Sequence, residues 1–259
     1  MKLLQIKRVV RKLRLPNKLP IILAIHIGAF LLLGAFTGCS NGANDDTINE
    51  PYDSRPIVCF GDSLTYGYGA SDGKNYPDFL QRRVNVPVIN AGVNGDTTVN
   101  ALNRINSDVL EKDPQLVIIE FGGNDLFHGI TAARIKSNLQ AMIRRVNNGS
   151  RKIYISNWIP ETGSTDASLF LVNILRSANG ASSLTQDQLK KFIVDFNAAL
   201  QSLSATANVE IVDNIFEGIY GNTQLMNDPL HPNSQGYEIM ADNYFKAIEP
   251  YLKANNLLR

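Results

Sequence analysis

The sequence predicts a doubly wound α/β fold, in which helices cover both faces of a five-stranded parallel sheet. Short apolar runs alternate along the chain with longer segments of helical periodicity, as expected when each parallel strand needs a crossover helix to reach its neighbour. About 204 residues, 56–259, follow an N-terminal leader and a polar linker. This length is enough to bury the core of one domain.

Five apolar runs are long enough for buried strands and too short for helices. The strands are expected at Pro56–Phe60, Pro87–Ala91, Leu116–Phe121, Lys152–Asn157 and Val209–Val212. The helices between them are expected at Tyr76–Val84, Val99–Lys112, Thr131–Asn147 and Gln186–Ala205. A last helix begins near Asn233, because apolar residues after it recur every three or four positions. The stretch Trp158–Leu184 is rich in Ser, Gly and Thr and is predicted to be a long loop.

Residues 1–38 have the pattern of an export signal. Basic residues and no acids precede an apolar run from Ile21 to Gly38, and small residues flank Cys39. This resembles a bacterial lipoprotein signal, which would be cleaved and leave Cys39 lipidated, although Phe36 replaces the usual Leu, Val or Ile. The alternative is an uncleaved anchor, since the run is near the lower length limit for crossing a membrane. In both cases we expect an exported protein anchored in the bacterial cell envelope, facing the periplasm or the exterior.

Residues 39–55 are polar and without periodicity, and are expected to form a flexible tether that begins at the lipidated Cys39. Without the leader, the chain has 18 basic and 24 acidic residues, a net charge of −6. A mildly acidic domain is not expected to bind nucleic acid. If Cys39 is lipidated, Cys59 has no disulfide partner, and it is interpreted as a small apolar residue of the first strand.

Ser63 follows the first strand directly, at the edge where open α/β sheets place their ligands. Three strands end in polar turns that contain glycine: Gly61–Ser63, Asn90–Thr98 and Glu120–Asp125. The carboxyl ends of parallel strands share one edge, so these turns can converge on one crevice. Glycines there let backbone amides approach a ligand closely. A serine in this position is a candidate nucleophile once a base can take its proton.

The base is sought among three histidines. His26 lies in the leader, and His128 is expected to be a loop or rim residue. His231 follows Asp228 in a loop stiffened by two prolines, so the carboxylate can hold one ring nitrogen and leave the other free. A solvated loop histidine is the alternative on spacing alone. Asp213, just after the fifth strand, is the rival to Asp228 as the acid, although Asp228 has the shorter connection to His231.

Four sequence blocks in order resemble those of the GDSL, or SGNH, hydrolases, and the resemblance covers essentially residues 56–259. The blocks are Gly61-Asp62-Ser63-Leu64, Asn90 to Thr98, Gly122-Gly123-Asn124-Asp125 and Asp228-Pro229-Leu230-His231. The chain is most similar to single-domain bacterial esterases with thioesterase and lysophospholipase activity. This resemblance implies a flavodoxin-like, three-layer α/β/α fold. The Gly-x-Ser-x-Gly elbow of ordinary α/β-hydrolases is absent around Ser63.

The resemblance also implies roles for the residues of these blocks. It makes Ser63 the nucleophile, His231 the base and Asp228 the acid. The oxyanion donors would be the amides of Ser63 and Gly95 and the side chain of Asn124. No metal or other cofactor is expected, because no histidine pair or cysteine cluster has ligand spacing.

Three neighbouring acids receive simpler interpretations. Asp62 is expected to cap the turn after it, and Asp96 and Asp125 are expected to organise their loops. The aromatic residues Trp158 and Phe170 are candidates for an acyl pocket, although packing is the more common role of such residues.

The expected function is hydrolysis of carboxylic esters or thioesters of acyl groups, such as lysophospholipids, acyl thioesters or simple esters, by a monomer that contacts the membrane through its lipid. A carbohydrate O-deacetylase acting on envelope polysaccharide is the alternative within the same chemistry. A tethered binding module without turnover is the alternative of another class. The complete set of residues with assigned roles argues against this last interpretation.

Overall fold

The computed structural model describes residues 53–158 and 166–259. Their strands form one sheet, made of β1 (Ile57–Gly61), β2 (Val88–Gly92), β3 (Leu116–Glu120), β4 (Lys152–Ser156) and β5 (Val209–Val212). Neighbouring strands are parallel and follow the order β2-β1-β3-β4-β5. This is the flavodoxin-like order, so the predicted fold class is confirmed. The strand boundaries differ from the predicted ones by at most one residue at each end.

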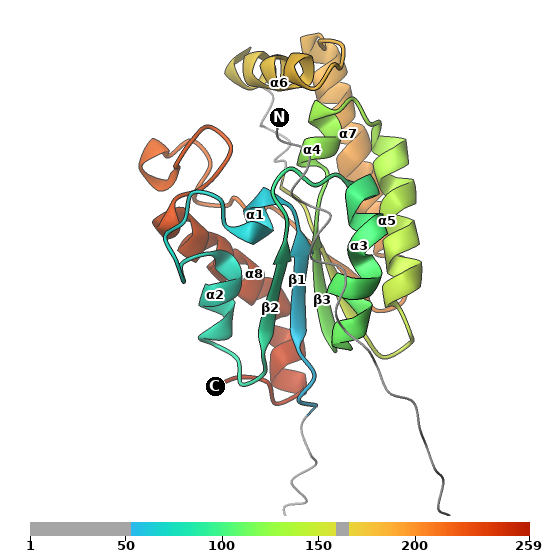
Figure 1. Cartoon of the computed structure of the whole chain (residues 1–259), viewed down its shortest axis with the longest axis vertical. Coiled ribbons are helices and arrows are strands. Elements are labelled where there is room, and N and C mark those ends of the chain that lie inside the picture. Colours follow the sequence, from blue (N-terminus) through green and yellow to red (C-terminus); the bar gives the residue numbers. More distant parts are fainter. Residues whose placement is uncertain (1–52, 159–165) are drawn as a thin grey trace, which may run out of the picture. The chain divides into compact units, whose positions relative to one another are not determined.

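Helices cover both faces of the sheet (Figure 1). One face carries α2 (Tyr76–Gln81) and α8 (Ser234–Ala254), and the other carries α3 (Thr98–Asp108), α5 (Ala132–Val146) and α7 (Gln186–Leu203). Short elements lie in the loops: α1 (Ser63–Tyr66), α4 (Gly123–Phe127) and the 3-10 turns η1 (Leu110–Lys112) and η2 (Thr223–Leu225). Side-chain oxygens cap most of the long helices, as at Thr97 before α3 and Thr185 before α7.

Each strand feeds two hydrophobic cores, because successive side chains point to opposite faces. Val58 and Phe60 of β1 belong to the core under α3, α5 and α7. Ile57 and Cys59 belong to the core under α2 and α8. Cys59 is fully buried, and burial raises the pKa of its thiol to about 12. It packs as a small apolar residue, as the sequence predicted.

The stretch Trp158–Leu184 is not the long loop that the sequence predicted. It contains a helix, α6 (Asp166–Ala178), which lies at the top in Figure 1. Leu169, Val172 and Leu175 pack against the core, whereas Phe170 and Ile174 are 70% and 50% exposed. Because apolar residues occupy both faces of this helix, its sequence lacks the polar stripe that marks an ordinary surface helix.

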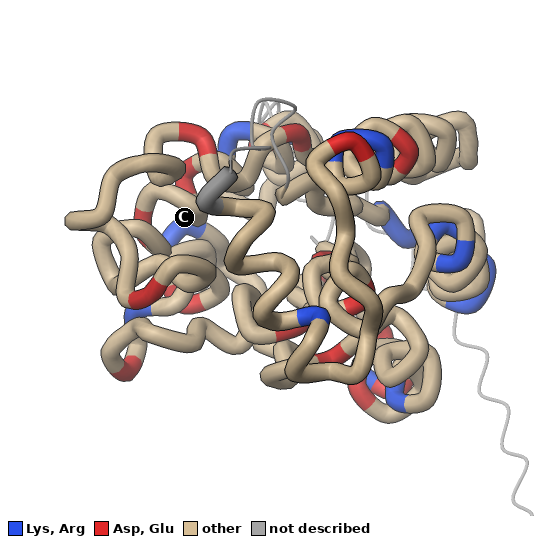
Figure 2. Tube along the Cα trace, turned by 90° about the horizontal axis from the view of Figure 1, so that it is seen from above, with Lys and Arg blue, Asp and Glu red and all other residues tan. Residues whose placement is uncertain are grey.

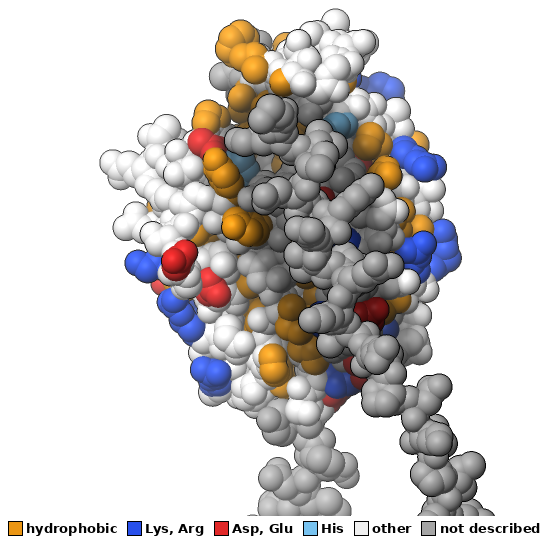
Figure 3. Space-filling model, in the orientation of Figure 1, with side chains coloured by type: hydrophobic (Ala, Val, Ile, Leu, Met, Phe, Trp, Pro, Cys, Tyr) orange, Lys and Arg blue, Asp and Glu red, His pale blue; other side chains and the backbone are white. Residues whose placement is uncertain are grey.

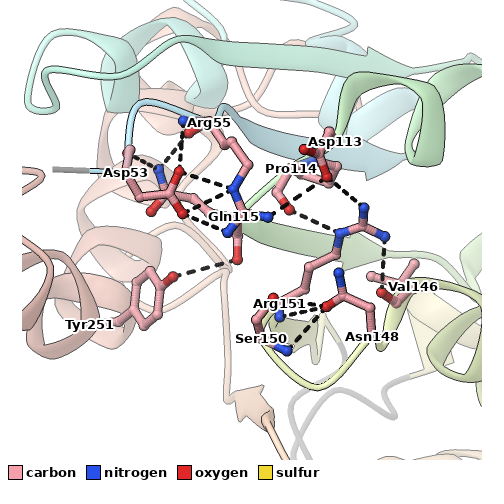
Figure 4. A network of polar contacts seen from close by, with 10 residues as sticks. All are labelled: Asp53, Arg55, Asp113, Pro114, Gln115, Val146, Asn148, Ser150, Arg151 and Tyr251. Atoms are coloured by element: carbon pink, nitrogen blue, oxygen red, sulfur yellow. Dashed lines mark hydrogen bonds and ion pairs between the residues drawn. The ribbon is translucent and has the colours of Figure 1, made fainter. Parts of the chain in front are cut away.

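A polar network closes the edge of the sheet at which the strands begin (Figure 4). The Nε2 atom of Gln115 donates to the carbonyl oxygens of Asp53 and Arg55, at 2.7 and 2.5 Å. Arg151 reaches the Asp113 carboxylate and the Pro114 carbonyl, at 2.8 and 3.1 Å. The Gln115 bonds fix the chain just before β1, and the Arg151 bonds fix the chain just before β3, both at the edge opposite Ser63.

The predicted signal at 1–38 and most of the predicted tether at 39–55, including Cys39, lie outside the described residues. Among the helices of the described ranges, none combines the length and apolar character needed to span a membrane.

Candidate active site

Ser63 begins α1 at the carboxyl end of β1. The chain can turn there because residue 61 is glycine. A Cβ atom at Gly61 would lie 2.0 Å from Oγ1 of Thr65 and 2.8 Å from the carbonyl oxygen of Glu120. Asp62 caps α1, as the sequence predicted, because its Oδ1 accepts the backbone N–H of Leu64 at 3.0 Å. These local constraints direct the Ser63 side chain out of the sheet edge.

The hydroxyl of Ser63 meets the imidazole of His231, which comes from the loop before α8. Ser63 Oγ lies 2.9 Å from His231 Nε2. The loop is closed by the backbone of Asn227, whose N–H donates to the His231 carbonyl at 2.8 Å. The ring of Tyr68 packs against the imidazole, with 4.7 Å between centroids. A serine next to a histidine in this geometry can pass its proton to the ring.

The other ring nitrogen of His231 faces Asp228. Nδ1 lies 2.9 Å from Oδ1 and 2.8 Å from Oδ2 of Asp228. The backbone N–H groups of Leu230 and His231 also donate to Oδ1, at 2.8 and 2.9 Å. Partial burial disfavours the charged form of Asp228, but these hydrogen bonds outweigh it and lower the pKa of this carboxyl. An ionised Asp228 can therefore orient the ring and stabilise its positive charge.

The two other candidates of the sequence analysis have other hydrogen-bond partners, although His128 lines the same cavity as Ser63. Asp213 is exposed and accepts a hydrogen bond from Gln201 Nε2 at 2.8 Å. His128 is exposed, and its Nδ1 lies 2.8 Å from the carbonyl oxygen of Asn124. The structure therefore brings Asp228, and not Asp213, to His231.

Asn124 lies in the first turn of α4, next to the Ser63 turn. Its Nδ2 donates to Oδ2 of Asp62 at 3.0 Å and to the carbonyl oxygen of Asp96 at 3.1 Å. Both partners are acceptors, so they select the NH₂ end of the amide. An oxyanion beside Asn124 would share these N–H groups with the two acceptors.

Gly95 lines the same cavity as Ser63. Its φ of +80° favours glycine, and no heavy atom lies within 4 Å of the position that a Cβ would take. The backbone N–H groups of Ser63 and Gly95 donate to no other residue in the part of the chain that the structure describes. Both amides are therefore available to an oxygen at the site.

The acids in the neighbouring loops have the structural roles that the sequence predicted. Asp96 forms an ion pair with Arg104, in which Asp96 Oδ2 lies 2.5 Å from Arg104 Nε. Asp125 accepts the backbone N–H of Thr98 at 2.9 Å and its hydroxyl at 2.5 Å. These bonds connect the second turn to α3 and to the third turn, so they hold Gly95 and Asn124, the expected oxyanion donors, near Ser63.

Glu120 is a site residue that sequence reasoning missed. It ends β3 and is fully buried. Its Oε2 accepts the backbone N–H of Asp62 at 3.4 Å. The only signal in the sequence was a charged residue inside the otherwise apolar run Leu116–Phe121.

A cavity of about 400 Å³ opens beside Ser63 and His231. Its apolar walls include Leu126, Phe127, Leu171, Val172, Leu175 and Ile193. Trp158 also lines it and packs against Phe196, with ring centroids 6.0 Å apart. Phe170, the second candidate for this pocket, does not line it and is 70% exposed. The helical geometry of α6 turns Leu171 and Val172 inward and Phe170 outward.

The residues that line the cavity include the acids Asp62 and Glu120 and no Lys or Arg. Figure 2 marks the basic and acidic residues along the trace, seen from above. Hydrophobic side chains gather near α6 at the top of Figure 3. Within residues 53–158 and 166–259, no group of three or more His, Cys, Asp or Glu could hold a metal ion.

Comparisons with known proteins show the family to which the chain belongs. The model of the "GDSL-like Lipase/Acylhydrolase family" matches residues 59–239. "Thioesterase 1/protease 1/lysophospholipase L1" of Escherichia coli K12 is 24% identical over 197 residues, which cover 75% of this chain and 83% of that protein. "Uncharacterized lipoprotein YqeF" of Bacillus subtilis is 28% identical over 200 residues, covering 71% of this chain and 76% of that protein.

Among solved structures, the lipase/acylhydrolase from Enterococcus faecalis is 27% identical, with a TM-score of 0.55. The match covers 79% of this chain and 97% of the Enterococcus chain. The fold, the site geometry and these matches lead to the same assignment. The protein belongs to the GDSL-like lipase/acylhydrolase family and is a carboxylic ester hydrolase.

Proposed function

We propose that the protein is a serine esterase that hydrolyses esters and thioesters of acyl chains. One observation carries this proposal: the hydroxyl of Ser63 lies 2.9 Å from Nε2 of His231, whose Nδ1 lies 2.8 Å from Asp228. Nucleophile, base and acid are thus in one line of hydrogen bonds, the geometry that serine hydrolysis requires.

In the proposed reaction, Ser63 Oγ attacks the carbonyl carbon while its proton passes to Nε2 of His231. The imidazolium is stabilised by Asp228. When the tetrahedral intermediate collapses, His231 returns the proton to the leaving alcohol or thiol. Water then attacks the acyl-serine ester, again with His231 as the base, and releases the carboxylic acid.

The developing oxyanion would accept the N–H groups of Ser63, Gly95 and the Asn124 side chain. Donors aimed at such an oxygen are worth roughly 3–4 kcal/mol of barrier each. The two free amides and the fixed NH₂ end of Asn124 support this assignment. The charge on the oxygen is present only in the intermediate and the flanking transition states, so these donors lower the barrier more than they strengthen substrate binding.

The cavity beside Ser63 supports an acyl chain as the substrate. Its walls are largely apolar and its volume of about 400 Å³ exceeds what an acetyl group would fill. We therefore propose acyl esters such as lysophospholipids, acyl thioesters or simple esters. Removal of acetyl groups from envelope polysaccharide, the alternative, would leave most of these apolar walls without a ligand.

A fluorophosphonate probe tests the nucleophile. The wild-type protein should be labelled at Ser63, with the adduct located by mass spectrometry, and Ser63→Ala should not be labelled. A wild-type protein that resists the probe and hydrolyses no ester would be a binding module instead, and the proposal would be wrong.

We also propose that the chain is exported, with residues 1–38 as its signal and Cys39 as the lipidated residue. Residues 39–55 would form the tether, and residues 56–259 would form a monomeric hydrolase domain. The sequence pattern around Cys39 and the naming of the Bacillus subtilis relative YqeF as a lipoprotein support this. Metabolic labelling with a fatty acid should modify the wild type and not Cys39→Ala. Equal labelling of the wild type and Cys39→Ala would contradict the lipid site. In a separate test of the oligomeric state, light scattering should give the mass of one chain.

A further inference from the structure

Asp62 connects the proposed nucleophile to the proposed oxyanion donor. Its Oδ1 accepts the Leu64 N–H that begins α1, and its Oδ2 accepts Nδ2 of Asn124 at 3.0 Å. A carboxylate can only accept these bonds, so it selects the NH₂ end of Asn124. If the amide turned over, its carbonyl oxygen would face the developing oxyanion and repel it. Asp62, together with the backbone carbonyl of Asp96, therefore determines which end of the Asn124 amide faces the substrate.

Glu120 supports Asp62 from the interior of the sheet. It is fully buried, and its Oε2 accepts from the Asp62 backbone N–H at 3.4 Å and from Thr65 Oγ1 at 3.1 Å. Its other oxygen, Oε1, is buried and receives no hydrogen bond from any donor among the described residues. The carboxyl groups of Asp62 and Glu120 also act directly on each other's pKa. Two neighbouring carboxyl groups can join in a hydrogen bond only if one of them carries a proton.

The surroundings favour a proton on Glu120. The titratable groups that face this pair are His231 and Asp125 on the Asp62 side and the phenols of Tyr76, Tyr237 and Tyr244 on the Glu120 side. Burial raises the pKa of Asp62 to about 6, and the N–H bond from Leu64 counteracts part of this rise. No Lys or Arg is among the groups that lower the pKa of Glu120. Burial, and then the neighbouring Asp62, raise the pKa of Glu120 well above its ordinary value.

We propose that Glu120 is a positioning residue that stays protonated and donates a hydrogen bond to the Asp62 carboxylate, which in turn holds the Asn124 amide with its NH₂ toward the reacting oxygen. The inference rests on the proposed function, because it requires Asn124 to be an oxyanion donor. Glu120 does not touch the substrate. It acts through Asp62, because its proton lets the Asp62 carboxyl stay ionised next to a second buried carboxyl group.

Two variants of Glu120 test this on the full protein. Glu120→Gln cannot ionise but can donate an N–H to Asp62, whereas Glu120→Met has a similar length and no donor. Steady-state hydrolysis of a p-nitrophenyl ester should show kcat for Glu120→Met about 10–100-fold lower with KM unchanged, a part of the loss expected when an oxyanion donor is removed. In the pH profile of kcat, the acid limb of Glu120→Met should lie at higher pH than that of the wild type. Glu120→Gln should have a wild-type kcat and a wild-type acid limb.

A mutant cycle with Asn124→Ala shows whether the two residues act together. If Glu120 acts through Asn124, adding Glu120→Met to Asn124→Ala should cost little more than Asn124→Ala alone. Additive losses would contradict the proposal. So would a Glu120→Gln variant as slow as Glu120→Met, because an ionised Glu120 would then be required, or a Glu120→Met variant as fast as the wild type.

Infrared spectroscopy reads the proton without activity and remains informative if Glu120→Met does not fold. The wild type at neutral pH should show the carbonyl stretch of a buried carboxylic acid, and Glu120→Gln should lack it. A wild-type spectrum without that band would overturn the proposal even in an active enzyme. Conversely, a wild type that shows the band but is not labelled by the fluorophosphonate at Ser63 would place the failure in the proposed function.

Discussion

Asp228 holds His231 through both the ring and the backbone. The Asp228 oxygens lie 2.9 and 2.8 Å from Nδ1, and Oδ1 also accepts the His231 backbone N–H at 2.9 Å. This doubly bonded turn fixes the rotation of the imidazole and leaves Nε2 directed at Ser63. Asp213 instead bonds Gln201, so the two candidate acids differ in environment.

Asp228→Asn should therefore lower kcat by about 10⁴, the order found when a triad acid is neutralised, because the ring loses its orienting charge. Asp213→Asn is the matched control and should stay within about twofold of the wild type. Initial rates with a p-nitrophenyl ester measure both. A normal Asp228→Asn beside an inactive Asp213→Asn would reverse the assignment of the acid.

Ser63→Ala should lower kcat by about 10⁶, if the residues act as a unit like other serine triads. The same ester assay measures it, and circular dichroism should show an unchanged fold, because the serine hydroxyl supports catalysis and little of the packing. Undiminished turnover in this variant would exclude Ser63 as the nucleophile.

Asn124→Ala should lower kcat by about 10²–10³ and leave KM nearly unchanged, because a donor to the oxyanion acts in the transition state. Asn85→Ala is a suitable control, since this exposed side chain bonds only the carbonyl of Asn256 at 2.9 Å. A loss in KM alone would make Asn124 a substrate-binding residue instead.

The proposed acyl pocket predicts that Val172→Phe changes the preference for acyl-chain length. The larger ring would fill the cavity, so kcat/KM for a long acyl ester should fall by about 10-fold while that for acetate esters stays the same. Ile174→Phe, on the exposed face of the same helix, is the control and should leave both values unchanged. Equal losses for short and long chains would contradict the pocket assignment.

The stability of the protein should report the buried carboxyl of Glu120. Its pKa is raised in the folded state above the ordinary value of 4.5, so the folded protein retains a proton that the unfolded chain releases. The free energy of unfolding therefore falls as the pH rises above about 4.5, and Glu120→Gln removes this loss.

Thermal melts at acid and at neutral pH test this dependence. The Tm of Glu120→Gln minus the Tm of the wild type should be a larger, more positive difference at neutral pH than at pH 4. Glu111→Gln, an exposed site, should show the same difference from the wild type at both pH values. A difference for Glu120→Gln that is independent of pH would mean that Glu120 is ionised in the folded protein.

Local patterns in the sequence were sufficient for the sheet and for the residues around Ser63. The strands are short apolar runs bounded by turns, and the four blocks lie at strand ends or beside a helix start, where the topology itself brings them together. The loop Asp228–His231 could be interpreted because the two residues are only three positions apart.

Other features depended on contacts between distant segments. The helix α6 escaped prediction because Phe170 and Ile174 on its exposed face are as apolar as Leu169 and Val172 beneath them. The pairing of Asp62 with Glu120 follows from the register of β1 and β3, in which Gly61 lies beside Glu120. No local pattern in either strand indicates which residues will be neighbours.

The network around Gln115 has a practical consequence. It fastens Asp53 and Arg55 at the beginning of β1, while Ser63 follows the end of that strand. An affinity tag or solid support attached ahead of Asp53 would join the domain on the far side from the mouth of the cavity. Immobilised enzyme coupled there should keep its entrance open to bulky esters.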